Sequence, residues 1–365
     1  MMLAGLECRQ KYSPPLLQAL TGYLVVEGVI NAGQDTTRIR LSRTKKLDDS
    51  AGVVPEAGAT VLVQSEGGDR YQLSEDSAGY YTVPYIGANP GQKFRLFITT
   101  AGNRQYASDY VEFKKTPPID SISWERKKNG VYIYANTHDN TNKTRYYRWE
   151  YVETWEHHAA FESDWEWRRE DTQIVYRTPA ERTYKCYTTR PSSDIVTTST
   201  AKLSSDVVYD KQIIFIPAST ERLGVKYSVL VKQYAITAEA YKYWQQLSAL
   251  TEQLGSIFSV EPTELTGNIH CLTDSTEPVI GFVSASTVEQ QRIFIDRQQI
   301  GEWYWPIYTG CDTVIITDFL QAWYEVPVRP IYPNNPYFSW FEFSTESCTD
   351  CRFQGGTLVK PPFWP

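Results

Sequence analysis

The sequence predicts a mainly β protein with two β-sandwich domains, the second carrying one long helix and a proline- and aromatic-rich C-terminal tail. Aromatic residues make up 14% of the 365 residues, with 26 Tyr and 11 Trp, and such side chains favour the half-buried surfaces of sheets. Many short apolar segments alternate with turn-forming residues, which is the spacing of a sandwich. The chain is also too long for one ordinary core, so two domains are expected.

The first domain is predicted as a β-sandwich over residues 21–116. In the segment 37–43, Ile39 and Leu41 alternate with Arg38 and Arg40, which is the pattern of a strand buried on one face. Its predicted strands cover residues 23–30, 37–43, 60–64, 70–73, 79–83, 94–98 and 106–113. Pro117 and Pro118 cannot donate backbone hydrogen bonds, so we place the domain boundary there.

The second domain is predicted over residues 117–365. Its strands are expected at 122–127, 131–136, 146–155, 212–216, 226–234, 278–284 and 292–296. Residues 238–254 contain strong helix formers without proline, between a possible N-cap at Thr237 and Gly255 at the C-terminal end. We expect this helix to pack against the second sandwich, and the tail 326–365 to wrap over the sheets.

An aromatic and acidic stretch in the second domain is the candidate surface for binding a ligand or partner. Residues 150–171 contain eight acidic residues beside several aromatic ones, and exposed aromatic side chains dominate the energetics of interfaces. The candidate residues are Trp149, Tyr151, Trp155, Phe161, Trp165 and Trp167. Two alternatives remain: the acidic residues protect an edge strand from pairing with other chains, or a pair of them hydrolyses a glycoside.

Charge and motifs exclude several classes of function. There are 36 Lys and Arg residues against 43 Asp and Glu, without the basic stripe that binding to phosphates requires, so no nucleic-acid partner is predicted. The sequence lacks the nucleophile elbow Gly-x-Ser-x-Gly and the glycine-rich phosphate loops. His157 and His158 are adjacent and would point to opposite faces of a strand. We therefore predict no catalytic residues, no metal site and no cofactor.

The cysteines and the N-terminus favour an exported protein. Residues 1–20 are interpreted as the remnant of a secretion signal, a lipid anchor and a linker, with Cys8 as the lipidated residue; an ordinary cysteine is the alternative. Apart from Cys8 and Cys186, the cysteines lie in the last third of the chain, and the candidate disulfide residues are Cys271, Cys311, Cys348 and Cys351. Their pairing and the role of Cys186 stay open, as does a zinc site at the Cys-x-x-Cys motif 348–351.

Several strings taken together resemble a family of Bacteroidota surface lipoproteins, catalogued as domain of unknown function 4249. They are the segments 8–15, 23–28, 55–61, 117–121, 146–150, 231–234, 254–258, 265–271 and 348–351, in the family's order along nearly the whole chain. Within this resemblance, residues 23–113 are similar to an immunoglobulin-like or transthyretin-like sandwich, as found in carboxypeptidase-regulatory domains.

The resemblance implies lipid attachment at Cys8, residence at the cell surface in the outer membrane, and a TonB-dependent β-barrel transporter as partner. The leading hypothesis is a non-catalytic accessory subunit, for binding or as a lid, of such a nutrient transporter. A stand-alone protein that binds glycans or peptides at the cell surface is the second hypothesis, and a hydrolase is the third.

Overall fold

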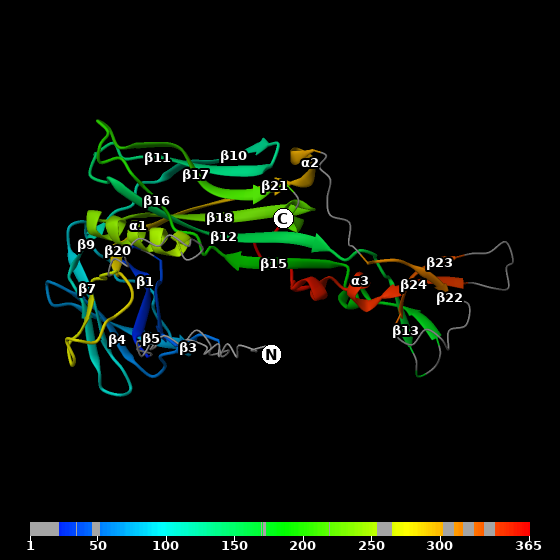
Figure 1. Ribbon diagram of the computed structural model, residues 1–365, viewed down its shortest axis with the longest axis horizontal. Helices are drawn as coiled ribbons and strands as arrows, with labels where there is room; N and C mark the ends of the chain where they lie inside the picture. Colours follow the sequence, from blue (N-terminus) through cyan, green and yellow to red (C-terminus); the bar gives the residue numbers. More distant parts are fainter. Residues whose placement is uncertain are drawn as a thin grey trace, which may run out of the picture. The chain divides into compact units, whose positions relative to one another are not determined.

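The computed structural model describes residues 22–365 apart from 34, 46–51, 169, 171–172, 219, 254–264, 302–309, 317–324 and 332–339. The prediction of a mainly β protein is confirmed, because strands account for most of its elements. The chain forms two compact units, of which the first contains residues 1–115 and 237–287 and the second contains residues 116–236 and 288–365. In Figure 1 the colours follow the sequence, so the two stretches of chain that make up each unit can be traced.

The strands of the first unit surround one apolar core. In β7 the burial alternates strictly, because every second residue from Phe94 through Leu96 to Ile98 is buried. The strands are β1 Leu24–Asn31, β2 Thr37–Arg43, β3 Val54–Pro55, β4 Thr60–Ser65, β5 Arg70–Ser77, β6 Tyr80–Val83, β7 Lys93–Thr99, β8 Gln105–Ser108, β9 Val111–Lys114, β19 Ile269–Cys271 and β20 Ser284–Ser286. Period-two burial is what a sheet with one face on a core requires.

Two strands of the first unit change partners halfway along their length, which closes the sheet on itself. β5 pairs with β4 through residues 70–73 and with β6 through residues 74–77. β9 pairs with β7 at residues 111–112 and with β20 at residues 113–114. The pairing therefore runs in a circuit from β7 through β4, β5, β6, β2, β1, β20 and β9 back to β7. A closed circuit of strands leaves no unpaired edge within it.

The circuit depends on a segment that was predicted to belong to the second domain. β20 lies parallel to both β1 and β9 and fills the place between them. The backbone of Gly281 approaches Val26 so closely that a Cβ at position 281 would lie 2.2 Å from the Val26 carbonyl oxygen. The first stretch of this unit ends at residue 115, and the unit continues with residues 237–287.

The long helix α1, Ala238–Gln253, belongs to the first unit and not to the second domain in which it was predicted. Among residues 238–251 of the helix, Ala240 and Tyr243 are buried, and the Tyr243 ring lies 5.2 Å from the ring of Phe282, two residues before β20. The predicted last residue, 254, lies outside the described residues. The helix therefore packs on the segment that completes the first unit.

The second unit contains a sandwich of two sheets and a smaller group of strands. Its strands are β10 Ile119–Lys127, β11 Gly130–His138, β12 Tyr146–His158, β13 Trp165–Arg168, β14 Gln173–Tyr176, β15 Lys185–Pro191, β16 Val196–Ser199, β17 Val207–Pro217, β18 Lys226–Ala235, β21 Val288–Asp296, β22 Val314–Ile316, β23 Glu325–Ile331 and β24 Trp340–Thr345. The sheet β10-β11-β17 and the sheet around β12 and β18 share one core, to which Ile133, Trp149 and Val231 contribute.

We call β13, β14, β22, β23, β24 and the short helix α3 (Glu346–Thr349) the disulfide-bonded lobe. Disulfides join Cys186 to Cys351 and Cys311 to Cys348. The prediction that Cys271 forms a disulfide is wrong, because its buried thiol is free. Cys8 lies outside the described residues.

The other short helices in the described part of the chain are α2, Arg297–Ile300, and 3-10 turns at 179–181, 221–223 and 351–354. Within the described part of the chain, no helix has the length and apolar character needed to cross a membrane.

Candidate binding site

Three of the predicted binding residues lie in the core of the second unit, so their assignment to an exposed binding surface is wrong. Trp149 is 0% exposed, Trp155 2% and Tyr151 5%. β12 is the central strand of its sheet, with β15 and β16 on one side and β18 on the other, and its aromatic face points into the sandwich. Aromatic residues at period two mark a common face, but the other sheet of the sandwich covers that face.

The polar atoms of Trp149 and Tyr151 are bound inside the protein, whereas the buried Trp155 Nε1–H has no hydrogen-bond partner among the described residues. The Trp149 Nε1–H group donates to Gln233 Oε1 at 3.0 Å, and the Gln233 amide donates to the Pro117 carbonyl oxygen at 2.8 Å. The Tyr151 hydroxyl donates to Asp194. Buried polar groups are costly unless they are paired, so these bonds have a structural role and leave nothing to offer a ligand.

Two of the acidic residues are also buried, as acceptors for partners on other elements. Glu153 accepts hydrogen bonds from Arg222 at 2.9 Å and from the Tyr227 hydroxyl at 2.8 Å. Glu156 accepts from His158 at 2.9 Å and from the Trp364 indole at 3.2 Å. These two carboxylates therefore do not lie on a solvent-exposed edge strand. This contradicts, for Glu153 and Glu156, the alternative in which the acidic residues protect an edge strand from pairing.

The other three predicted residues lie in or next to the disulfide-bonded lobe and are half-buried: Phe161, Trp165 and Trp167. The Trp165 ring contacts the rings of Tyr176, at 3.7 Å between centroids, and Phe341, at 5.3 Å. Trp165 therefore helps to hold the hairpin β13–β14 against β24. The structure does not bring the six predicted residues together at one surface.

A polar cavity of about 230 Å³ lies where the hairpin β13–β14 meets α3. It contains residues of both signs of charge. The lining residues are Glu166, Arg177, Glu181, Thr183, Val326, Glu346, Thr349, Asp350 and Arg352. Only Glu166 belongs to the stretch that the sequence singled out, so this is a different site from the predicted one.

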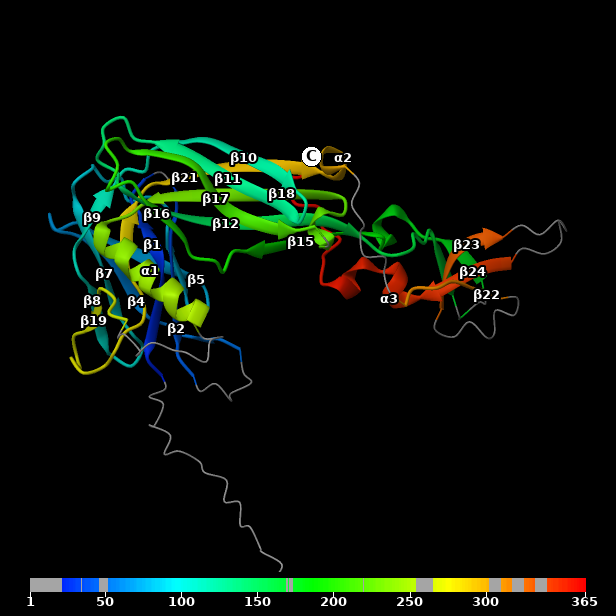
Figure 2. The ribbon, with the colours of Figure 1, turned by 45° about the horizontal axis from the view of Figure 1, so that its top comes forward.

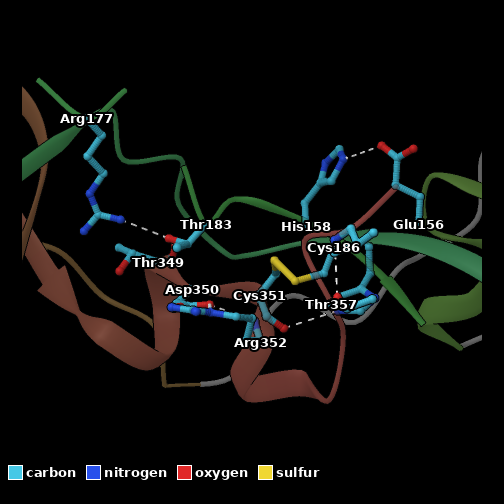
Figure 3. Close-up of a disulfide and its surroundings, with 12 residues drawn as sticks. Glu156, His158, Arg177, Thr183, Cys186, Thr349, Asp350, Cys351, Arg352 and Thr357 are labelled. Atoms are coloured by element: carbon cyan, nitrogen blue, oxygen red, sulfur yellow. Dashed lines mark hydrogen bonds and ion pairs between the residues drawn. A yellow bond between two sulfur atoms is a disulfide. The ribbon is translucent and has the colours of Figure 1, made fainter. Parts of the chain in front are cut away.

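Arg177 is held in place at the wall of this cavity. Its Nε–H donates to the Trp165 carbonyl oxygen at 2.9 Å and its Nη1 to Thr183 Oγ1 at 3.1 Å. The Thr183 hydroxyl in turn donates to the carbonyl oxygen of Thr349 at 3.0 Å. Figure 3 shows this chain of contacts beside the disulfide between Cys186 and Cys351. The guanidinium is thus preorganised rather than free to rotate.

The lining also contains the pair of Asp350 and Arg352. Burial favours the neutral form of Asp350, but hydrogen bonds from the Arg352 side chain and backbone outweigh this and lower the pKa of Asp350 below its ordinary value. Glu166 and Glu346 are exposed at the cavity and form no ion pair within the described parts of the chain. Fixed cations beside two unpaired carboxylates suit a small polar ligand that carries both signs of charge.

The histidines are placed as their adjacency predicts. His158 Nε2 lies 2.9 Å from Glu156 Oε1, whereas His157 is buried, with its Nε2 3.3 Å from the Cys351 carbonyl oxygen. Among the described residues, no three His, Cys, Asp or Glu side chains are grouped to hold a metal ion. Cys348 and Cys351 are in disulfides, which rules out the alternative of a zinc site at this motif.

The first unit contains a second cavity, of about 270 Å³, beside a buried ion network. Glu277 accepts hydrogen bonds from the Tyr106 hydroxyl, at 2.7 Å, and from Arg104. Arg43 pairs with both Glu277 and Glu56. Because every charge in this network already has a partner, its role is to attach the segment before β20 to the sandwich.

One sequence motif indirectly indicated the cavity in the second unit, and the other lining residues were not predicted. The Cys-x-x-Cys motif at 348–351 marks the segment that forms one wall. Arg177 and Thr183 lie in a region without periodicity, and their place depends on a disulfide between residues 165 positions apart. Such long-range pairing cannot be deduced from the cysteine spacing.

Comparison with known proteins gives one family. The family described as "Domain of unknown function (DUF4249)" matches residues 9–292. No curated protein matches this chain. Among solved structures, a crystal structure of chicken CNTN1 FN1–FN3 domains is similar at 10% identity and a TM-score of 0.18, over 58% of this chain and 62% of that one. A TM-score this low gives no information about the fold.

Proposed function

Since the chain belongs to the DUF4249 family, we propose that it is a non-catalytic cell-surface lipoprotein, an accessory subunit of a TonB-dependent outer-membrane nutrient transporter. The observation that carries this proposal is the cavity of the disulfide-bonded lobe. Its Arg177 and Arg352 side chains are held by internal hydrogen bonds beside the carboxylates of Glu166 and Glu346, which are unpaired among the described residues, an arrangement suited to holding a polar nutrient. Preorganised charge of both signs favours specific binding.

The two disulfides support an extracytoplasmic location. Disulfides persist in oxidising compartments and are rare in the cytosol, where thiols are kept reduced. The pairs Cys186–Cys351 and Cys311–Cys348 tie the lobe together and to β15. In this proposal, lipid on Cys8 anchors the protein to the outer membrane, and the lobe captures the nutrient for the β-barrel partner or covers it as a lid.

Co-purification from outer membranes tests the partner. The protein is expressed in its native host with a C-terminal tag, extracted in mild detergent and captured. A TonB-dependent β-barrel should be recovered in near-stoichiometric amount. Recovery of the protein without any β-barrel would contradict the proposal.

A Cys8→Ser variant tests the anchor separately. Loss of the acyl chains should move the protein from the membrane fraction to the soluble fraction, because one or more lipid chains supply the membrane affinity. A Cys271→Ser variant is the control, since its thiol is buried and unpaired in the first unit. If the Cys8→Ser variant remains in the membrane fraction, the proposal that lipid on Cys8 anchors the protein is wrong.

A stand-alone surface protein that binds glycans or peptides is the second candidate. It is favoured by exposed aromatic side chains such as Tyr209, at 81%, and Phe215, at 38%. Binding of a soluble ligand by the isolated protein, without a transporter, is the measurement that favours it. A hydrolase is the remaining alternative, and metal analysis with a glycoside screen tests it.

A further inference from the structure

The outer face of the sheet β10-β11-β17 carries aromatic rings that the core does not use. Residues of β11 alternate, with Val131, Ile133 and Ala135 in the core and Tyr132 and Tyr134 on the outer face. Figure 2 shows the three strands side by side. The register of the sheet leaves the aromatic residues on this face only partly buried, so their presence needs a reason other than core packing.

The rings are arranged in a row across the strands. Tyr132 is directly opposite Phe215 of β17, and their ring centroids are 4.8 Å apart with planes tilted by 38°. Tyr134 is the next outward residue on β11, two positions along from Tyr132. Neighbouring outward residues of a strand are about 7 Å apart. The three rings thus lie on one face of the sheet, Tyr132 in contact with Phe215 and Tyr134 beside them, and we call them the aromatic strip.

Polar side chains flank this strip on both neighbouring strands. Tyr134 is opposite Ser123 on β10 and Gln212 on β17, and both of these residues are exposed. Across the described residues, neither Ser123 nor Gln212 has a side-chain hydrogen bond. A cross-strand aromatic pair stabilises a sheet by itself, which accounts for Tyr132 with Phe215. It does not account for Tyr134 between two unpaired polar groups.

The strip carries no net charge. Glu125, opposite Tyr132, pairs with Lys127 at 3.1 Å. The Lys127 ammonium donates to the Tyr134 hydroxyl at 3.0 Å and lies 4.7 Å from the Tyr132 ring centroid. Lys127 is exposed, and exposed ion pairs and cation–π contacts of this kind are weak. A ligand can therefore displace the lysine side chain from the rings at small cost.

We infer that this face, defined by Tyr132, Tyr134, Phe215, Ser123 and Gln212, binds a neutral oligosaccharide. The apolar C–H face of a pyranose ring stacks on tyrosine and phenylalanine rings, which present apolar area with little conformational entropy to lose. The serine hydroxyl and glutamine amide offer the donors and acceptors that sugar hydroxyls require. The neutrality of the strip excludes strong recognition of a charged ligand.

The inference deepens the second candidate function and does not require a transporter. A peptide would instead be expected to add to the edge of a sheet, where backbone groups are available, rather than to lie on its face. The face is also distinct from the charged cavity of the disulfide-bonded lobe, because it shares no residue with that cavity.

Calorimetric titration of the purified full chain with neutral oligosaccharides tests this inference. The probes are maltoheptaose, cellohexaose, xylohexaose and mannohexaose, with a casein hydrolysate as the peptide probe. At least one oligosaccharide should bind, and Tyr132→Thr and Phe215→Thr should each weaken that binding at least tenfold. Threonine retains the strand propensity while removing the ring. Phe353→Thr, which removes an exposed ring outside the face, should bind like the unaltered protein.

Three results of these titrations would contradict the inference. Binding of no oligosaccharide, binding of the hydrolysate alone, or equal binding by the Phe215→Thr and Phe353→Thr variants would overturn the inference. The thermal midpoint of each variant is measured first, and the Ser123→Ala variant, which retains all rings, gives a second reading if a threonine variant unfolds. Ser123→Ala should weaken binding about threefold. Failure here leaves the co-purification result unaffected, so the two proposals fail independently.

Discussion

At the scale of single residues, Glu156 shows how a buried carboxylate is kept ionised. Its side chain is 9% exposed, and burial alone raises the pKa of an acid. Hydrogen bonds from His158 and Lys185, together with their charges, outweigh that effect and lower the pKa of Glu156 to about 2 from an ordinary value of 4.5. The carboxylate also accepts a hydrogen bond from the indole N–H of Trp364, near the end of the chain.

This pKa predicts how the stability of the fold depends on pH. A depressed pKa stabilises the folded state fully above pH 4.5, and the contribution disappears as the pH falls towards 2. The shift corresponds to a contribution on the order of 3 kcal/mol. Urea unfolding of the Glu156→Gln variant should therefore show a lower free energy of unfolding at pH 7, and a difference from the unaltered protein that shrinks below pH 4. A difference that is constant from pH 7 to pH 2.5 would contradict this account.

Gly281 lies where the first unit closes, and its lack of a side chain allows the backbone there to approach Val26. Its φ of +137° is rarely adopted by other residues, and a Cβ there would lie 2.2 Å from the Val26 carbonyl oxygen. Gly281→Ala should lower the free energy of unfolding by more than about 2 kcal/mol, because both backbone strain and a collision result. Gly52→Ala is the control, since its Cβ would meet nothing within 4 Å. Equal stabilities of the two variants in urea would count against the close approach.

At the scale of elements, most strands follow from alternation, whereas the elements that complete the fold do not. β12 was predicted from its period-two aromatic residues, but the period alone does not say which sheet covers that face. β20 has the sequence Ser-Ala-Ser, which is too short and too polar to predict a strand. β23 contains Pro327 and Pro330, which argue against a strand in sequence but are tolerated at the edge of a sheet.

The candidate site was predictable only in part, for a similar reason. Trp165 was named as a candidate binding residue, but its ring contacts depend on β24, which the tail pattern did not predict. The charged cavity needs Arg177 and Asp350, far apart in sequence, to be brought together by the disulfide. Local patterns carry no information about such non-local pairs.

The two disulfides should differ in their effect on stability. Cys186–Cys351 closes a loop of 165 residues and Cys311–Cys348 a loop of 37. Because a longer loop loses more entropy on closure, replacing both cysteines of the first pair by alanine should cost about 1 kcal/mol more than replacing both of the second. Urea unfolding of the two double variants measures the difference. A larger loss of unfolding free energy in the Cys311 and Cys348 double variant would show that local geometry, and not loop length, determines how much each disulfide stabilises the fold.

At the scale of the whole molecule, each compact unit is built from two separate stretches of chain. Residues 22–115 contain nine of the strands of the first unit but lack β20, which lies between β1 and β9. Without β20 the circuit of strands is open at two apolar edges, and such edges pair with other chains.

A chain truncated after Lys115 is therefore expected to aggregate or to remain partly folded. Joining residues 237–287 to it through a flexible linker should restore a cooperative unit, because β19, β20 and α1 return to their places. Two-dimensional NMR spectra, in which dispersed amide signals report the folded state, distinguish the two chains. Dispersed signals from the shorter chain would show that the sandwich closes without β20.

The interleaving of the two units also sets the order in which the chain can fold as it is made. The ribosome must add about 170 residues after Lys115 before the stretch ending at Thr287 is complete, which takes on the order of 10–30 s at ordinary rates of synthesis. During that time the N-terminal strands have no partner for their open edges. A nascent chain of this kind depends on being shielded until its own later part arrives.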